Sequence, residues 1–300
     1  MVSVVVRSPA KINLQLSVGP VREDGYHELV TVFHAVSLDD VITVSEGPGI
    51  GLTMRGEGSQ SLPVDDSNLA VRAARLLAEH VGIEPNVTIH IDKSIPIAGG
   101  MAGGSADAAG TLVACDALWQ TGLSREDLSE LAARLGSDVS FALYGGNAIG
   151  RGRGEQITPI LGRGQFHWVL ALADQGLSTP DVYRRCDELR EGQAIRPVEV
   201  SQTLLHALRS GDASSLADAL HNDLQPAALS LRPSLKRLLD AGIEFGALGA
   251  VVSGSGPTCA FVVRDSDHAL DVAVALTASG VCRTVKRAHG PVAGAKVVNS

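Results

Sequence analysis

Aromatic side chains are scarce in this sequence, since Phe, Trp and Tyr together make up 3% of its 300 residues. A hydrophobic core with so few rings must consist largely of Val, Leu, Ile and Ala. A group of aromatic residues close to polar, chemistry-bearing residues is therefore a candidate site for stacking on a ligand.

Basic residues are also few relative to acidic ones. The 33 Asp and Glu outnumber the 25 Lys and Arg, which gives a formal net charge of −8. A general nucleic-acid binder needs a basic face to neutralise phosphates, so no nucleic-acid partner is predicted. A local basic patch could still hold a small phosphorylated ligand.

Cysteine pairs and long apolar runs are absent. No two of the four cysteines (Cys115, Cys186, Cys259 and Cys282) are close in sequence, so there is no C-x-x-C spacing for a metal. No run approaches the roughly 20 apolar residues of a membrane span, and no apolar stretch follows a basic head at the N-terminus. We expect a reduced, soluble, cytoplasmic protein without a membrane partner, and no protein partner is predicted.

The hydrophobic pattern of the first half predicts strands and then helices. Strands are expected at residues 2–7, 11–18, 29–36, 41–45 and 87–91. Helices are expected at residues 68–80, from the glycine-rich segment to Trp119, and from Ser124 to Gly136, where Ser124 and Asp127 have the spacing of a capping box.

A glycine- and arginine-rich stretch at residues 150–154 divides this half from the next. We place the domain boundary there and predict domains at residues 1–155 and 156–300. Beyond it, strands are expected at 167–173, 250–253, 259–264 and 282–286. Helices are expected from Thr179-Pro180 and at 201–209, 213–222, 233–241 and 266–279.

The most informative segment spans residues 96–106, where four glycines occupy six positions. Such a loop can turn its backbone N–H groups toward an anion at the N-terminus of the helix that follows. Small residues flank the loop, and the hydroxyl of Ser105 can reach a phosphate oxygen or a metal-bound water. A plain flexible turn is the alternative, but the small flanking residues favour phosphate binding. The spacing is neither that of a Walker loop nor that of a dinucleotide-binding fingerprint.

Three blocks resemble the GHMP kinases and occur in that family's order. They are PAKINL at residues 9–14, the glycine-rich loop at 96–106, and SGSGPT at 253–258. In the loop, Met101 stands where the family commonly has Leu, and Ala102 stands where it commonly has Gly. The segments DGYHEL at 24–29 and GSDV at 136–139 are similar to one branch of the family, whose substrate is a cytidine diphosphate-linked methylerythritol.

The resemblance implies a two-domain α+β fold, with a ribosomal-protein-S5-like N-terminal domain and a ferredoxin-like C-terminal domain. It implies ATP-dependent phosphorylation of the substrate's 2-hydroxyl, with Mg²⁺, in the non-mevalonate route to isoprenoid precursors. Two alternatives stay open. One is a GHMP kinase of the mevalonate or homoserine type, and the other is a GHMP-fold protein that binds a ligand without turnover.

The resemblance also implies the roles of two catalytic residues. Asp138 would accept the proton of the substrate hydroxyl, although by itself it could equally be an N-cap for residues 139–143. Lys11 would keep Asp138 ionised and stabilise charge on the phosphoryl oxygens, where an isolated lysine would usually be solvated. Asn13 shares the face of Lys11 and should contact the substrate.

Two further groups of residues follow from the same resemblance. Tyr26 would stack on the cytosine ring and His27 would hydrogen-bond its edge, with Phe33 and Tyr183 nearby; Phe33 could equally be core, and Tyr183 a helix-face residue. Asn68 and Lys93 would border the ATP site, with helix capping and solvent exposure as their respective alternatives. The remaining ATP- and phosphate-binding candidates form the loop itself: Pro96, Ile97, Ala98, Gly99, Gly100, Met101, Ala102, Gly103, Gly104, Ser105 and Ala106.

Overall fold

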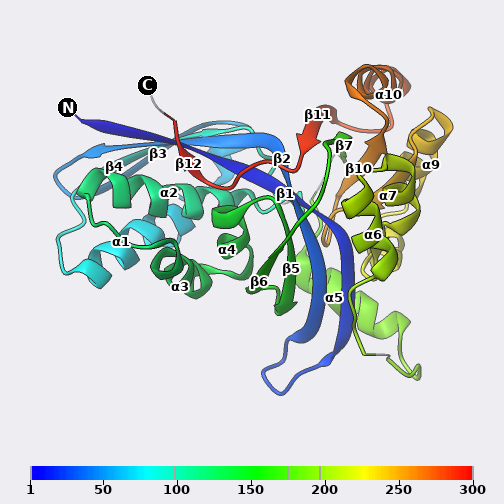
Figure 1. Cartoon of the computed structure of the whole chain (residues 1–300), viewed down its shortest axis with the longest axis horizontal. Helices are drawn as coiled ribbons and strands as arrows, with labels where there is room; N and C mark the ends of the chain where they lie inside the picture. Colours follow the sequence, from blue (N-terminus) through cyan, green and yellow to red (C-terminus); the bar gives the residue numbers. More distant parts are fainter. Residues whose placement is uncertain (1, 98, 174–175, 196, 299–300) are drawn as a thin grey trace.

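The computed structural model describes residues 2–97, 99–173, 176–195 and 197–298. Its strands form two sheets that lie in different lobes of the molecule (Figure 1). The larger sheet has the order β12-β1-β2-β4-β3, with β5 paired to β2 and β6, and β8 paired to β1. Its strands are β1 (Ser3–Val21), β2 (His27–Glu46), β3 (Ile50–Gly56), β4 (Val87–Lys93), β5 (Asn147–Gly152), β6 (Gln156–Ile160), β8 (His221–Asn222) and β12 (Lys296–Val297).

Strands β1 and β2 are long and run from one lobe into the other (Figure 1). The sequence pattern predicted two strands in each, because Pro9 and the pair Asp39 and Asp40 resemble breaks. The register of β1 on β2 shifts between Pro9 and Ala10, and again between Asn13 and Gln15. A bulge tolerates proline and bends the strand without ending it, so each pair of predicted strands is one continuous strand.

Four helices pack on the larger sheet and form a hydrophobic core with it. They are α1 (Leu69–Val81), α2 (Gly103–Trp119), α3 (Arg125–Leu135) and α4 (Ser137–Tyr144). The predicted capping box of α3 is confirmed, because Ser124 and Asp127 each bond the other's backbone N–H. Helix α2 begins directly after the glycine-rich loop, as the sequence indicates, and both termini lie in this lobe (Figure 1).

The second sheet is antiparallel, with the order β11-β7-β10-β9. Its strands are β7 (Phe166–Leu172), β9 (Gly249–Val252), β10 (Thr258–Val263) and β11 (Thr284–Gly290). Helices lie between β7 and β9 and between β10 and β11, which gives the β-α-β-β-α-β sequence of the expected ferredoxin-like arrangement. The helices are α5 (Thr179–Leu189), α6 (Gln202–Ser210), α7 (Ala213–Ala219), α8 (Gln225–Leu231), α9 (Ser234–Glu244) and α10 (Ser266–Ser279).

The glycine-rich stretch taken as a domain boundary lies largely within the β5–β6 hairpin. A Cβ atom on Gly150 would stand 2.7 Å from the ring of Phe33, so this glycine permits close packing on β2. Strands β3, β5, β6, β8 and β12 were not predicted, and the helix expected at 213–222 ends at Ala219, before β8. The proposed boundary between residues 155 and 156 falls in the turn of this hairpin, and the division into domains there stays a prediction.

Cys115, Cys186 and Cys259 are free thiols buried in the core. Within the part of the chain that the structure describes, no helix is long and apolar enough to cross a membrane. The same residues contain no group of three or more His, Cys, Asp or Glu that could hold a metal ion.

Candidate active site

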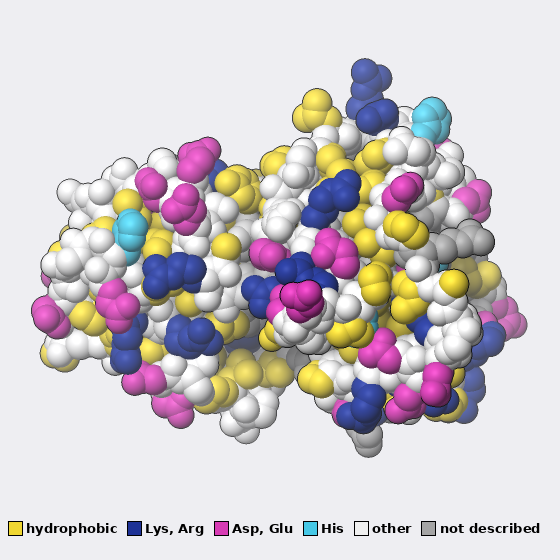
Figure 2. Space-filling model, turned by 90° about the horizontal axis from the view of Figure 1, so that it is seen from below, with side chains coloured by type: hydrophobic (Ala, Val, Ile, Leu, Met, Phe, Trp, Pro, Cys, Tyr) yellow, Lys and Arg dark blue, Asp and Glu magenta, His cyan; other side chains and the backbone are white. Residues whose placement is uncertain are grey.

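A cavity of about 610 Å³ lies where the glycine-rich loop meets β1, β2, α4 and α5. Its wall comes from both halves of the chain, since Tyr183 and residues 254–255 face the loop and Asp138. Seen from below the view of Figure 1, Lys/Arg and Asp/Glu side chains are interspersed on the surface (Figure 2). A cavity of this size can enclose much of a small molecule.

The glycine-rich loop opens onto this cavity at the N-terminus of α2. The first N–H groups of a helix have no partner within the helix, and α2 has no acidic residue in its first turn, so its positive end is available to an anion. Ala102, at the N-cap, adopts the left-handed conformation with φ 59°. The family's usual glycine would adopt it without the steric cost to a Cβ atom.

The loop packs against the C-terminal glycine block at residues 253–258. The Ser253 hydroxyl donates a hydrogen bond to the carbonyl oxygen of Gly100 over 3.1 Å. Gly100 has φ 72°, and a Cβ atom there would lie 2.1 Å from the Ser253 carbonyl oxygen. Only glycine can occupy position 100 without a clash with Ser253, and this contact holds the loop against the C-terminal glycine block.

Most of the predicted phosphate-binding residues line the cavity, but not all of them. Met101 and Ala106 are fully buried and pack in the core beneath the loop. Ala98 lies outside the described residues. The loop residues that line the cavity are Pro96, Ile97, Gly99, Gly100, Ala102, Gly103, Gly104 and Ser105.

Lys11 and Asp138 come together at the cavity wall. The Lys11 ammonium nitrogen lies 3.5 Å from Oδ2 of Asp138, and the lysine side chain is 8% exposed where the aspartate is 31% exposed. Gly136 is the N-cap of α4, so Asp138 belongs to the first turn and the N-cap alternative is wrong. The alternative of a solvated Lys11 is also wrong.

Asn13 holds the Lys11 ammonium in place. Its Oδ1 accepts a hydrogen bond from Lys11 Nζ over 2.7 Å, and its Nδ2 donates to the hydroxyl of Thr31 over 2.7 Å. Lys11 and Asn13, which share one face of this strand, are buried rather than solvated. Both side chains line the cavity. The backbone N–H of Lys11 also donates to the Met101 carbonyl, which ties β1 to the loop.

Two of the predicted base-pocket aromatics line the cavity. Phe33 stacks on Phe141 with ring centroids 4.8 Å apart, so it belongs to the core and borders the cavity at once. Tyr183, on α5, contributes its ring to the wall. Burial, with the nearby carboxylate of Asp138, raises the pKa of Tyr183, which keeps its phenol neutral.

Tyr26 and His27 lie beyond the cavity wall. Tyr26 is 56% exposed, and the guanidinium of Arg153 lies 4.9 Å from the centroid of its ring. His27 Nε2 is 2.8 Å from Oδ1 of Asp187, and its ring is 5.2 Å from that of Tyr183. Both residues therefore lie next to residues that line the cavity, Arg153 and Tyr183.

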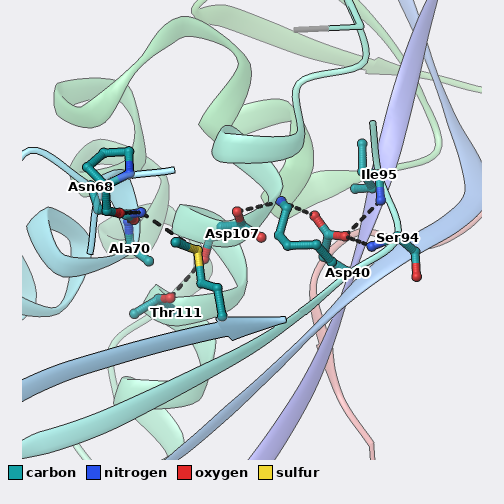
Figure 3. Close-up of polar contacts among 10 residues, drawn as sticks. Asp40, Asn68, Ala70, Ser94, Ile95, Asp107 and Thr111 are labelled. Carbon is teal, nitrogen blue, oxygen red and sulfur yellow. Dashed lines mark hydrogen bonds and ion pairs between the residues drawn. The ribbon is translucent and has the colours of Figure 1, made fainter. Parts of the chain in front are cut away.

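Asn68 and Lys93 line the cavity as predicted. Asn68 is also the N-cap of α1, since its side chain accepts a hydrogen bond from Ala70 N over 2.9 Å (Figure 3). Lys93 is not the solvated residue of the alternative reading. Its ammonium is buried between the carboxylates of Asp40 and Asp107.

Several cavity residues were not predicted from the sequence. Thr179 was expected to open a helix, which it does with Ser178 as the N-cap, and its hydroxyl lies 2.8 Å from that of Ser255. Arg153 stands in the stretch taken as a domain boundary, where its charge could have indicated a ligand contact. The other unpredicted lining residues are Leu16, Leu29, Thr31, Leu62, Pro63, Ser67, Leu69, Ile95, Asp107, Ser137, Gly154, Leu224, Gly254 and Ser255.

Comparison with known families matches both halves of the chain. The model for the GHMP kinases N terminal domain matches residues 68–146, and that for the GHMP kinases C terminal region matches residues 204–282. The chain belongs to the GHMP kinases. The family predicted from the three sequence blocks is thus confirmed, and membership implies ATP as the phosphoryl donor.

The similar curated proteins are full-length matches. The 4-diphosphocytidyl-2-C-methyl-D-erythritol kinase of Mycolicibacterium smegmatis is 59% identical, over 99% of this chain and 92% of its own. The proteins of the same name from Rhodococcus jostii and Mycobacterium tuberculosis are 56% and 57% identical, over 99% of this chain and 95% and 94% of theirs.

Solved structures agree with the predicted fold. A crystal structure of 4-(cytidine 5'-diphospho)-2C-methyl-D-erythritol kinase has a TM-score of 0.78 and 34% identity, and the match covers 96% of this chain and 98% of that one. Homoserine kinase from Cytophaga hutchinsonii has a TM-score of 0.76 at 20% identity, over 99% of this chain and 97% of its own, which shows the shared fold alone.

Proposed function

We propose that this kinase transfers the γ-phosphoryl group of ATP to the 2-hydroxyl of 4-diphosphocytidyl-2-C-methyl-D-erythritol, in the cytoplasm, in the non-mevalonate route to isoprenoid precursors. The observation that carries the proposal is the meeting of Lys11 and Asp138 in one cavity wall with the glycine-rich loop. The names of relatives at 56–59% identity support the choice of substrate.

Asp138 and Lys11 have complementary roles in this proposal. Asp138 takes the proton of the acceptor hydroxyl as that oxygen attacks the γ-phosphorus, while the bond from phosphorus to the β–γ bridging oxygen breaks and ADP leaves. Lys11, held by Asn13, orients the carboxylate and offsets negative charge on the phosphoryl oxygens. Phosphoryl transfer needs mainly such positioning and charge stabilisation.

The loop and the start of α2 hold the triphosphate in this arrangement. The left-handed Gly100 lets the loop pack closely against Ser253, and the first-turn amides of α2 are available to the phosphates. Mg²⁺ supplies charge neutralisation on the phosphates when it is bound. The Ser105 hydroxyl and the Asp138 carboxylate, which both line the cavity, are oxygen donors of the kind that Mg²⁺ prefers.

In this proposal the cytidine end of the substrate lies against the part of the cavity wall that Tyr183 and Phe33 form. Tyr183 and Phe33 provide aromatic surface there, and His27 with Tyr26 stands behind it. We propose that the base stacks in this region and that His27 contacts its edge. Stacking on an aromatic side chain contributes about 1–3 kcal/mol per base.

The test is a coupled ADP-release assay with three acceptors. We expect kcat/KM for the cytidine-linked substrate to exceed that for mevalonate or homoserine by at least about 10³-fold, because a site built around a base loses that binding with smaller acceptors. Faster turnover of mevalonate or homoserine would assign the chain to the other branch. ATP binding without ADP release from any acceptor would identify a non-catalytic protein.

A further inference from the structure

Three buried charged side chains lie beneath the glycine-rich loop. Lys93 ends β4, Asp40 belongs to β2, and Asp107 stands in the first turns of α2. The Lys93 ammonium is 2.6 Å from Oδ2 of Asp107 and also bonds Oδ2 of Asp40. The three side chains are 1%, 0% and 4% exposed in the order Lys93, Asp40 and Asp107. Ion pairs so deeply buried persist only where the geometry satisfies them.

The cluster fixes the beginning of the loop. Oδ1 of Asp40 accepts hydrogen bonds from the backbone N–H groups of Ser94 and Ile95, over 2.6 and 2.9 Å (Figure 3). These two residues directly follow Lys93 and lead into the loop. One carboxylate therefore holds the lysine with one oxygen and the loop backbone with the other.

The same cluster fixes the end of the loop. Asp107 lies one turn beyond Gly103, where α2 begins, and binds Lys93 from that side (Figure 3). A Cβ atom on Gly103 would stand 3.5 Å from the Lys93 ammonium, so the charged group lies directly under the first turn. Both ends of the loop are thus attached to one rigid point in the core.

The charges show why Lys93 is unsuited to bind phosphate itself. Its ammonium already has two carboxylate partners, so the cluster carries one positive and two negative charges if all three groups are ionised. Burial raises the pKa of Asp107 to about 7, which the charge of Lys93 opposes. Burial alone would lower the pKa of Lys93, but Asp107 and Asp40 raise it, so the ammonium stays charged.

We propose that Lys93, Asp40 and Asp107 are positioning residues that hold the phosphate-binding loop in its nucleotide-ready shape. When the loop is already ordered before the nucleotide binds, none of the binding free energy is lost in ordering it. The cluster then sets the affinity for ATP and ADP, while Lys11 and Asp138 set the rate of transfer. This inference rests on the proposed binding of the nucleotide phosphates at the loop.

A variant at Asp40 tests the positioning role without removing a group that could contact the nucleotide directly. Asp107 lines the cavity, and among the described residues its Oδ1 has no hydrogen-bond partner, so a bound nucleotide could contact it. Asp40 is fully buried and is not among the described residues that line the cavity. A change at Asp40 can reach the nucleotide only indirectly, through the loop backbone or through Lys93.

The experiment measures Mg·ADP binding to the full-length protein by calorimetry, without acceptor. Asp40→Asn and Asp107→Asn each remove one carboxylate charge from Lys93, and Asp40→Asn keeps an oxygen for the two loop amides. We expect each variant to raise the Kd for ADP by about tenfold. Asp116→Asn is the matched control, because Asp116 caps the other end of α2, where it accepts a hydrogen bond from Leu123 N over 3.3 Å.

Steady-state kinetics separates positioning from a loss of folded protein. Positioning predicts a higher KM for ATP, with KM for the acceptor and kcat within about twofold of wild type. A merely structural role would reduce the folded fraction of Asp40→Asn and Asp107→Asn, and with it kcat, while KM for ATP would not change. If Asp107→Asn does not fold, the ADP affinity of Asp40→Asn alone decides the proposal.

Three results would overturn the proposal. They are an ADP affinity unchanged in both asparagine variants, an equal loss in Asp116→Asn, or a loss in Asp107→Asn alone, which would mean direct contact. Because ADP binds without the acceptor, a wrong acceptor assignment leaves this test intact. A wild-type protein that binds no ADP would instead refute the proposed function.

Discussion

The ammonium nitrogen of Lys11 lies 3.5 Å from Oδ2 of Asp138, although one residue comes from β1 and the other from the first turn of α4. The lysine is the more buried of the two, and both residues line the cavity. The pair therefore presents a carboxylate to the acceptor with a positive charge beside it, which keeps the carboxylate ionised and able to take up a proton.

Asp138→Asn tests the catalytic half of this pair. The amide has the shape of the carboxylate but cannot take up the hydroxyl proton, so we expect kcat to fall by about 10²–10⁴-fold. The affinity for ADP without Mg²⁺ should stay within about threefold, because the nucleotide is held by the loop. A coupled ADP-release assay and calorimetry check both values. Asp271→Asn, on the exposed surface of α10, is the control. Full turnover in Asp138→Asn would remove this residue from the mechanism.

Gly100→Ala tests the shape of the phosphate-binding loop. The added Cβ would lie 2.1 Å from the Ser253 carbonyl oxygen at a φ of 72°, so the loop must move. We expect KM for ATP to rise by tenfold or more, since the amides leave their positions. Gly51→Ala, where the nearest atom to a new Cβ is 3.9 Å away, should change neither KM nor kcat. Equal kinetics in the two variants would show that the loop does not need Gly100.

Tyr183→Ala tests the proposed base pocket. The loss of one stacking ring, worth about 1–3 kcal/mol, predicts a rise of roughly 5- to 150-fold in KM for the cytidine-linked substrate. KM for ATP should not change, because in the proposed arrangement Tyr183 contacts the acceptor and the loop holds the nucleotide. Tyr144→Ala removes a ring that contacts Arg125 outside this cavity, and it should leave both constants unchanged. A parallel rise in both KM values after the Tyr183 change would place the base elsewhere.

The site residues that stand in short sequence motifs could be predicted. The loop at 96–106 indicated phosphate binding by its own composition, whereas the roles of Lys11, Asn13 and Asp138 followed from the family resemblance of their blocks. Most helices follow from hydrophobic periodicity and caps, as Ser124 and Asp127 show, and the two-domain fold was implied by the same resemblance.

The Lys93 cluster could not be predicted in the same way. Its members come from three elements, and a single Asp in a strand such as Asp40 has no local signature of a buried ion pair. Only the pairing of β2 with β4 brings Asp40 beside Lys93. Strand continuity was missed for a related reason, because Pro9 predicts a break unless the partner strand is known to accommodate a bulge.

A buried histidine supports the last prediction, on pH and stability. His34 is fully buried, its Nε2 accepts a hydrogen bond from the indole N–H of Trp168 over 3.2 Å, and its Nδ1 is 2.6 Å from Oδ1 of Asn147. An indole N–H can only donate, so the imidazole is neutral with its proton on Nδ1. Burial lowers the pKa of His34 from 6.5 to about 4, against the effect of the Asn147 hydrogen bond.

His34 therefore binds a proton less readily in the folded protein than in the unfolded chain. The contribution of neutral His34 to stability is complete above pH 6.5 and is lost as pH falls through about 4. His34→Gln can keep both hydrogen bonds but does not titrate. We expect the free energy of unfolding of wild type, relative to this variant, to fall by about 2–3 kcal/mol between pH 7 and pH 4.5. Urea denaturation followed by tryptophan fluorescence measures both proteins, and the groups that they share cancel in the difference. A constant difference over this range would mean that His34 takes up its proton as readily in the folded protein as in the unfolded chain.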